Sequence, residues 1–231
     1  STFGGGNSRS IALGDVDGDG DLDVAVANDS NQAEEIWLND GSGNFSAGDT
    51  FGFGNSKSIV FGDMDGDGDL DVAVANDGDP GGVWLNDGSG NFSFSDAFGG
   101  DDGRSIALGD VDGDGDLDVA MASYFNRAEE IWLNNGNGTF SFTDAFGTGY
   151  SSGIALGDVD GDGDLDAAVA NALGQAEEIW LNDDASAWVI SNEAVVTITV
   201  NAVNDSLMAV DDIVELDTLT SPQFSGHKDK I

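Results

Sequence analysis

The stretch Asp15-Val-Asp-Gly-Asp-Gly-Asp-Leu-Asp23 decides how the rest of the sequence is interpreted. It places a carboxylate at every second residue and glycines at its fourth and sixth positions, and related copies begin at Asp63, Asp110 and Asp158. Five aspartates in nine residues repel one another, and no packed core requires them. A hard divalent cation would turn this repulsion into attraction, and calcium accepts about six to eight oxygen ligands in irregular geometry. The sequence therefore predicts four calcium loops, one per repeat.

Each position of the loop has an expected role. In the first copy Asp15, Asp17 and Asp19 supply side-chain oxygens. The main-chain carbonyl of Asp21 serves at the seventh position, and Asp23 closes the loop at the ninth. The glycine at the sixth position allows the positive φ that wraps a chain around an ion. The equivalent side-chain ligands are Asp63, Asp65, Asp67 and Asp71; Asp110, Asp112, Asp114 and Asp118; and Asp158, Asp160, Asp162 and Asp166, with Asp69, Asp116 and Asp164 at the carbonyl position.

Two other interpretations of the loops are weaker. An EF-hand needs an acidic residue at the twelfth position between two helices, but that position holds Val26, Val74, Met121 and Val169. A single Asp/Gly run is also compatible with a solvated, flexible turn. Four copies in register, at spacings of 48, 47 and 48 residues, argue against that alternative.

The composition limits the function classes. The chain has 231 residues with 45 acidic and 6 basic side chains, for a formal net charge of −39. Nucleic acid and anionic membrane surfaces are therefore disfavoured as partners, since both need a basic face. Cysteine is absent, and no apolar run approaches the ~20 residues of a membrane helix. Weak calcium sites fill where calcium is around millimolar, which predicts a secreted or cell-surface location.

The residues around each loop alternate like short strands. Ser10-Ile-Ala-Leu-Gly precedes the first loop, and Leu22-Asp-Val-Ala-Val-Ala follows it with large residues on one face and alanines on the other. Apolar residues on both faces fit a sheet sandwiched between neighbours. Glu34-Glu-Ile-Trp-Leu-Asn is a third expected strand, and an Asp40-Gly-Ser-Gly turn leads to a fourth that ends near Phe51-Gly52. Four short strands per repeat fit one blade of a β-propeller.

These motifs resemble FG-GAP or VCBS repeats, the units of the integrin α-chain head and of many bacterial surface proteins. The resemblance rests on the Asp-x-Asp-Gly-Asp-Gly-x-x-Asp loops, the turn from Trp37 to Phe45 and the Phe-Gly pairs. It implies an all-β, calcium-binding propeller with an ion between the first two strands of each blade. Family propellers usually have about seven blades, so a four-bladed ring and part of a larger ring both stay open. We expect Trp37, Trp84, Trp132 and Trp180, which recur at one register, to pack between blades.

The expected propeller spans residues 1–185, with repeats at about 8–54, 55–102, 103–150 and 151–185. The fourth repeat departs from the pattern after Asn182, so we expect its last strand to be missing or altered, and Ser1-Thr-Phe-Gly is a candidate to close the ring there. Residues 186–231 form an expected C-terminal strand, linker and loose tail. Within them, residues 193–212 resemble the junction between cadherin-like or Ig-like repeats of large bacterial adhesins. The chain begins inside the end of a repeat, so we expect it to be part of a larger multidomain protein.

The sequence favours binding over catalysis. Catalysis needs a nucleophile with a base, an acid–base pair or an open metal site. The only histidine is His227 in the tail, and the paired glutamates recur by repeat, so we expect no enzyme. The loops opposite the calcium hairpins are the candidate ligand face, and they carry Tyr124, Arg127, Arg104 and Tyr150. Aromatic and cationic groups on an acidic body can hold a glycan or an acidic partner loop, although ordinary surface residues are the simpler alternative.

The leading hypothesis is a calcium-stabilised extracellular adhesion or interaction module with a protein or glycan ligand at the cell surface. One alternative is a lectin-like targeting module of a polysaccharide-degrading enzyme. The other is a structural spacer between extracellular domains. About four Ca²⁺ ions, one per repeat, are the expected cofactors, and no direct membrane insertion is expected.

Overall fold

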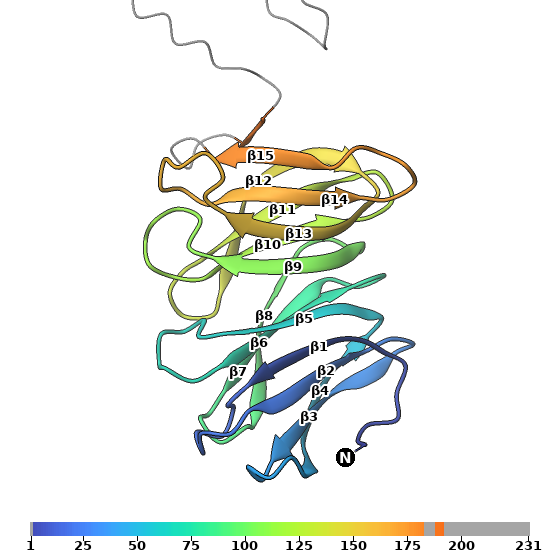
Figure 1. The fold of residues 1–231 in the computed structure, drawn as a ribbon, viewed down its shortest axis with the longest axis vertical. Coiled ribbons are helices and arrows are strands. Elements are labelled where there is room, and N and C mark those ends of the chain that lie inside the picture. The colour runs from blue at the N-terminus through green and yellow to red at the C-terminus, as the bar shows by residue number, and fades with distance from the viewer. Residues whose placement is uncertain (1, 183–187, 192–231) are drawn as a thin grey trace, which may run out of the picture. The chain divides into compact units, whose positions relative to one another are not determined.

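Four antiparallel sheets of four strands each make up the described part of the chain (Figure 1). The computed structural model describes residues 2–182 and 188–191, which lie in the unit Ser1–Ala194. The strands are β1 (Ser8–Gly14), β2 (Asp23–Asn28), β3 (Gln32–Asn39), β4 (Phe45–Gly54), β5 (Ser56–Gly62), β6 (Asp71–Asn76), β7 (Gly81–Asn86), β8 (Phe92–Phe98), β9 (Gly103–Gly109), β10 (Asp118–Ser123), β11 (Arg127–Asn134), β12 (Phe140–Gly149), β13 (Ser151–Gly157), β14 (Asp166–Asn171), β15 (Glu178–Asn182) and β16 (Trp188–Ile190). The predicted adhesin-like segment at residues 193–212 lies outside the described residues.

Each sheet corresponds to one repeat, so the predicted all-β fold of four four-stranded blades is confirmed. The strands run as a meander, in the order β1-β2-β3-β4 and its equivalents. The first two strands pair in the same register in every blade, for example Ala12 with Ala25 and Ala155 with Ala168. The described residues contain no helix that is long and apolar enough to cross a membrane.

The second strand is buried on both faces in the first three blades, whereas β14 of the last blade has exposed residues. All six residues of β2, β6 and β10 are buried. Ala25 and Ala27 of β2 share one core cluster with Val72 and Val74 of β6, so the alanine face of one blade packs on the large residues of the next. The close approach of two sheets explains why one face of the strand carries only small side chains.

Aromatic contacts also join neighbouring blades. Phe51, from the Phe-Gly pair that ends the first blade, lies 5.3 Å from the ring of Trp84 and 5.1 Å from that of Phe92 in the second blade. Phe146 of the third blade makes the same contacts with Trp180 and Trp188 of the fourth, at 5.3 and 4.7 Å. The predicted packing of the recurrent tryptophans between blades is therefore confirmed at these two junctions.

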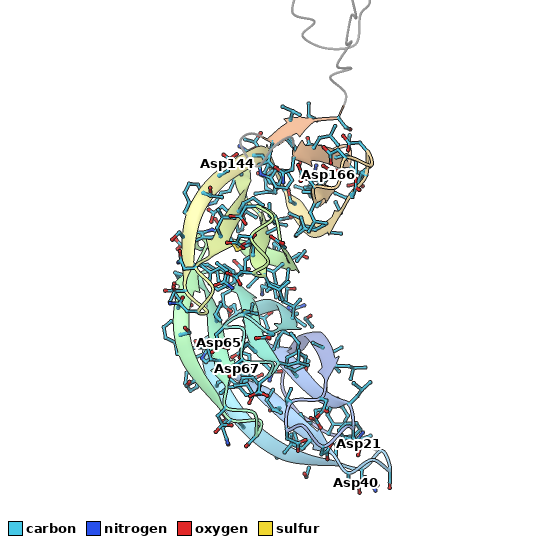
Figure 2. All side chains as sticks on the ribbon, turned by 90° about the vertical axis from the view of Figure 1, so that its left-hand side faces the viewer. Asp21, Asp40, Asp65, Asp67, Asp144 and Asp166 are labelled. Carbon is cyan, nitrogen blue, oxygen red and sulfur yellow. The ribbon has the colours of Figure 1, made fainter. Side chains whose placement is uncertain are left out.

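The four blades do not form a closed ring in the part of the chain that the structure describes. The main contacts between sheets join each blade only to its neighbours in the sequence, and Figure 2 shows the sheets following one another along an arc. The short strand β16 takes the fourth position of the last blade, so the expected closure by Ser1-Thr-Phe-Gly is wrong. Instead Phe3 packs on Trp37 and Phe45 of the first blade at 5.5 and 4.8 Å, as Phe51 and Phe146 pack on the equivalent residues of the blade after them.

A glycine at the end of each first strand sets the distance between blades, and this leads to a prediction. A Cβ on Gly62 would lie 2.7 Å from Leu108 Cδ1 and 2.8 Å from Leu117 Cδ1 of the next blade, whereas nothing lies within 4 Å of a Cβ on Gly157. We expect Gly62→Val to lower the free energy of unfolding by about 1–3 kcal/mol through overpacking. Gly157→Val is the matched control and should have little effect. Equal denaturant midpoint shifts for the two variants would contradict this account of blade spacing.

Candidate functional site

The aspartate-rich loops join the first and second strands of their blades, at the left side of Figure 1. Gly18 and Gly20 of the first loop have φ values of 73° and 93°, and the equivalent glycines of the other loops also have positive φ. Residues other than glycine rarely adopt this backbone conformation, so the two glycines allow the loop to turn tightly here. The turn brings the carboxylates of the first and third positions close together in every loop.

Backbone N–H groups hold the loop carboxylates in place. Asp15 accepts hydrogen bonds from the Gly18 and Gly20 N–H groups through its two oxygens, both at 2.9 Å. Asp17 accepts from Asp19 N–H at 3.2 Å, and Asp19 accepts from Asp21 N–H at 2.9 Å. The second and third loops repeat all of these bonds. Such bonds stabilise the ionised carboxylates and orient them before an ion arrives.

The ninth position of each loop is buried. Asp71 is fully buried, and its two oxygens accept hydrogen bonds from Met64 N–H and Asn86 N–H, both at 2.8 Å. Burial raises the pKa of Asp71 to about 6, although these hydrogen bonds act in the opposite direction. Burial raises the pKa of Asp118 to about 6 in the same way. A nearby cation would offset the cost of keeping these buried carboxylates ionised.

The loops bring carboxylate oxygens together in all four blades. In each group three side chains offer one oxygen each, and all three oxygens lie within 4.8 Å of one another. The groups are Asp15, Asp17 and Asp19; Asp63, Asp65 and Asp71; Asp110, Asp112 and Asp118; and Asp158, Asp160 and Asp166. An oxygen-rich cluster of this kind fits a hard cation such as Ca²⁺. Each repeat therefore contains a possible metal site.

Not every predicted ligand belongs to these groups. The aspartate at the fifth position belongs to a group only in the first loop, as Asp19. In that loop the buried Asp23, at the ninth position, does not belong to the group. The carboxylates of position seven point elsewhere: that of Asp21 lies against Gly41 in the turn between β3 and β4, and those of Asp69 and Asp116 lie against the equivalent turn glycines. In Figure 2 Asp21 and Asp40, the residue before Gly41, lie together at one corner of the first blade. This orientation is compatible with the carbonyl role that the sequence suggested for position seven.

The opposite loop face carries a row of ion pairs that crosses three blades. Asp29 contacts Arg9 at 2.6 Å and Lys57 at 3.0 Å. Asp77 contacts Lys57 at 3.7 Å and Arg104 at 3.0 Å. The hydrogen bond from Lys57 is the largest of several effects that lower the pKa of Asp29 to about 2. Most of the basic side chains on this face are therefore already paired, which the sequence did not indicate.

The predicted ligand residues come together at the end of this row. The Arg104 guanidinium lies 4.6 Å from the centroid of the Tyr124 ring, and the Tyr124 and Tyr150 rings are 5.1 Å apart. Arg127 forms an ion pair with Asp102, whose backbone carbonyl accepts a hydrogen bond from Tyr124 N–H at 3.0 Å. Four side chains from the third blade and its junction with the fourth thus form one cluster.

Sequence reasoning missed one member of this cluster. Phe125 lies 5.0 Å from Tyr124, is 56% exposed and has a φ of 57°. Left-handed backbone at a bulky residue marks a constrained loop tip. The signal available in the sequence was an aromatic pair inside a variable loop. We name Tyr124, Phe125 and Tyr150 the aromatic cluster.

Comparisons with known proteins agree with this architecture. A sequence profile of the FG-GAP-like repeat matches residues 15–74, 63–121 and 110–169, which together cover more than half of the chain. No curated protein matches the chain. Among solved structures, a lectin of Agrocybe aegerita, described as recognising non-reducing terminal N-acetylglucosamine, is 23% identical with a TM-score of 0.51.

The alignment with this lectin covers 77% of the present chain and 49% of the lectin, so the chain spans about half the length of its structural relative. At this identity the likeness concerns the fold, and the lectin has the β-propeller architecture that the four blades indicate. The repeated aspartate loops, the blade topology and the profile match agree with one another. The chain belongs to the family of FG-GAP-like repeat proteins.

Proposed function

We propose that the chain is an extracellular binding module, in which Ca²⁺ in the four aspartate loops stabilises the blades and the opposite loop face binds a glycan. Supporting the metal assignment, four groups of converging carboxylate oxygens recur, one per blade. Calcium suits them better than magnesium, because the loops offer many oxygens in an irregular arrangement rather than a rigid octahedron. An extracellular location fits a repeat that is typical of extracellular proteins and sites that fill at high calcium concentration.

The aromatic cluster is the observation that supports glycan binding most directly. Its rings are partly exposed in a body that is otherwise strongly acidic. Rings of this kind stack on the apolar faces of sugars, and neighbouring polar groups then fix the orientation of the ligand. Arg104 is such a neighbour: its side chain is 25% exposed, and its guanidinium lies 4.6 Å from the centroid of the Tyr124 ring. A binding role, without catalysis by this chain, is part of the same proposal.

The proposal predicts that Tyr124→Ala and Phe125→Ala weaken glycan binding by about thirtyfold each, the effect of losing an aromatic hot spot of about 2 kcal/mol. The first probe is a glycan array that includes chains ending in N-acetylglucosamine, because the structurally similar lectin is described as recognising that sugar. The array is measured in millimolar calcium, followed by titration of the best glycan.

Phe94→Ala is the matched control, because Phe94 is 61% exposed but lies in the second blade, away from the aromatic cluster. Equal binding by Tyr124→Ala and the unmodified chain would contradict the glycan site. A protein ligand that needs the same rings would favour the adhesion form of the hypothesis over the lectin form. No ligand at all for a calcium-loaded, folded chain would favour the spacer.

A further inference from the structure

The two end blades leave uncovered the faces that the other blades bury. In the first blade Ile11 and Leu13 are 60% and 62% exposed, whereas Ile59, the equivalent of Ile11 in the second blade, is 2% exposed. In the last blade Val159 is 57% exposed, whereas its equivalent Val16 in the first blade is 1% exposed. The first blade therefore exposes the face that, in the other blades, packs on the preceding blade. The last blade exposes the face that, in the other blades, contacts the following blade.

The last blade retains the small residues that receive a following blade. A Cβ on Gly14 would lie 2.6 Å from Leu70 Cδ1 of the next blade, so glycine is required there by close packing. Gly157 is the equivalent residue of the last blade, and nothing lies within 4 Å of a Cβ built on it. At the other junctions this space is filled by a leucine of the following blade, such as Leu70. Its equivalent in the first blade is Leu22, which is 57% exposed. Similarly, Ala168 of β14 is half-buried and Ala170 is exposed. The equivalent residues of β2, Ala25 and Ala27, are completely buried.

Polar groups at the two ends also match. At each junction within the unit an asparagine of the following blade donates through Nδ2 to a loop carbonyl of the preceding one, as Asn86 does to Val16 O at 2.8 Å and Asn182 to Val111 O at 3.0 Å. Asn39 is the equivalent donor of the first blade, and its Nδ2 bonds only within its own blade, to Leu22 O, among the described residues. The matching carbonyl at the other end belongs to Val159.

We infer that the last blade of one copy packs on the first blade of a second copy, through the same interface that joins consecutive blades within the chain. The two exposed faces are different and complementary, so the contact is head-to-tail rather than isologous. Two copies joined at both ends would make a ring of eight blades, within the usual range of about four to eight. This inference rests on blade packing and does not depend on the proposed glycan site.

One departure indicates that this contact is weaker than the junctions inside the chain. Ser10, Ser58 and Ser105 each accept a hydrogen bond at 3.4 Å from a backbone N–H of the following blade. The last blade has Gly153 at this position and cannot supply that acceptor. The net charge of −39 on each copy also opposes association, so the assembly should depend on protein concentration, salt and calcium.

The test is sedimentation equilibrium of the full chain in millimolar calcium and physiological salt, at about 1 to about 100 µM so that micromolar dissociation constants are resolved. We expect association into dimers. Ile11→Arg and Gly157→Val should each weaken it by at least about tenfold, because the first buries a charge and the second fills the space needed by Leu22. Both positions are open in the single copy, so thermal melts of the variants should match the unmodified chain at concentrations where all three proteins are monomeric. Phe94→Arg, which changes an exposed aromatic residue of an inner blade, is the control and should leave association unchanged.

A mixture of the two variants distinguishes the direction of the contact. Gly157→Val keeps an intact first blade, and Ile11→Arg keeps an intact last blade, so an equimolar mixture should recover one good contact and form a one-to-one dimer. Recovery in the mixture would support the head-to-tail interface. A chain that stays monomeric throughout the range, association that neither variant weakens, or a mixture no stronger than the separate variants would each overturn the inference.

Discussion

Chelation of calcium is expected to lower the thermal midpoint of this chain by tens of degrees. A site that is saturated about a hundredfold above its dissociation constant contributes about 2.7 kcal/mol, so four sites contribute on the order of 10 kcal/mol. That is comparable with the total stability of a typical domain, about 5–15 kcal/mol. Each loop also holds five aspartates within nine residues, and their repulsion is no longer balanced once the ion leaves. The measurement is a pair of calorimetric melts with excess Ca²⁺ and with chelator, together with a titration that counts bound ions.

A variant that disrupts only one of the four loops makes this experiment specific. Asp63→Asn with Asp65→Asn removes two converging carboxylates of the second loop and should reduce the ion count from about four to about three. Asp101→Asn changes an exposed acid between β8 and β9 that belongs to none of the four groups, and it should leave the count unchanged. Identical melts with and without chelator, together with no bound ions, would show that the loops are solvated turns.

The loops and blades were predictable because their determinants are local. Carboxylates and glycines at fixed offsets define each loop, and the alternation of residues around it defines the strands. The fate of Phe3 was not predictable in the same way, because a phenylalanine can either extend a strand or pack between blades. In the structure Phe3 does not extend a strand but packs on Trp37 of the first blade. Ring closure depends on how every pair of blades packs, and no short motif records that.

Buried polar contacts across a blade junction were also beyond the sequence. Glu34 and Glu35 looked like one recurrent acidic pair, yet they have different environments. Glu35 accepts a hydrogen bond from its own blade's Trp37 Nε1–H at 2.9 Å. Glu34 is 1% exposed and contacts Ser56 at the start of the second blade. Which of two adjacent glutamates is buried depends on the position of the next blade, and that partner is 22 residues away in the sequence.

Glu34 is expected to be a neutral acid in the folded chain. The Ser56 hydroxyl lies within hydrogen-bond distance of both Glu34 Oε1 and Asn76 Oδ1, but it has a single hydrogen to donate. The Asn76 amide orientation is fixed, because Nδ2 donates to Pro80 O at 2.9 Å. Both contacts of the Ser56 hydroxyl are hydrogen bonds only if the protonated Glu34 donates to Ser56 Oγ and Ser56 donates to Asn76 Oδ1. Burial, the largest effect on this group, correspondingly raises the pKa of Glu34 from 4.5 to about 7.

The direction of the pH dependence follows from this raised pKa. Between pH 4.5 and about 7 the folded chain holds a proton that the unfolded chain has released, so the stability from Glu34 is complete below pH 4.5 and is lost as pH rises through 7. Glu34→Gln is neutral at every pH and can donate to Ser56 through its amide. We therefore expect the variant to gain stability relative to the unmodified chain as pH rises from 5 to 8, by at most about 3 kcal/mol. The measurement is the difference in free energy of unfolding between the two proteins across that range.

Taking this difference removes the titration of the four aspartate loops, because those carboxylates are present in both proteins. Glu35→Gln is the matched control, because it makes the same substitution at the neighbouring carboxyl, which lies outside the buried chain of hydrogen bonds. Glu129 contacts Ser151 in the same way at the junction of the third and fourth blades, and burial raises its pKa too. The junction between the second and third blades has Gly81 at this position, with its Cβ site only 2.7 Å from the Phe98 ring. The proposal is that the two glutamate junctions weaken as pH rises, whereas the glycine junction does not. A stability difference between Glu34→Gln and the unmodified chain that does not change with pH would contradict this, because Glu34 would then be ionised in the folded chain.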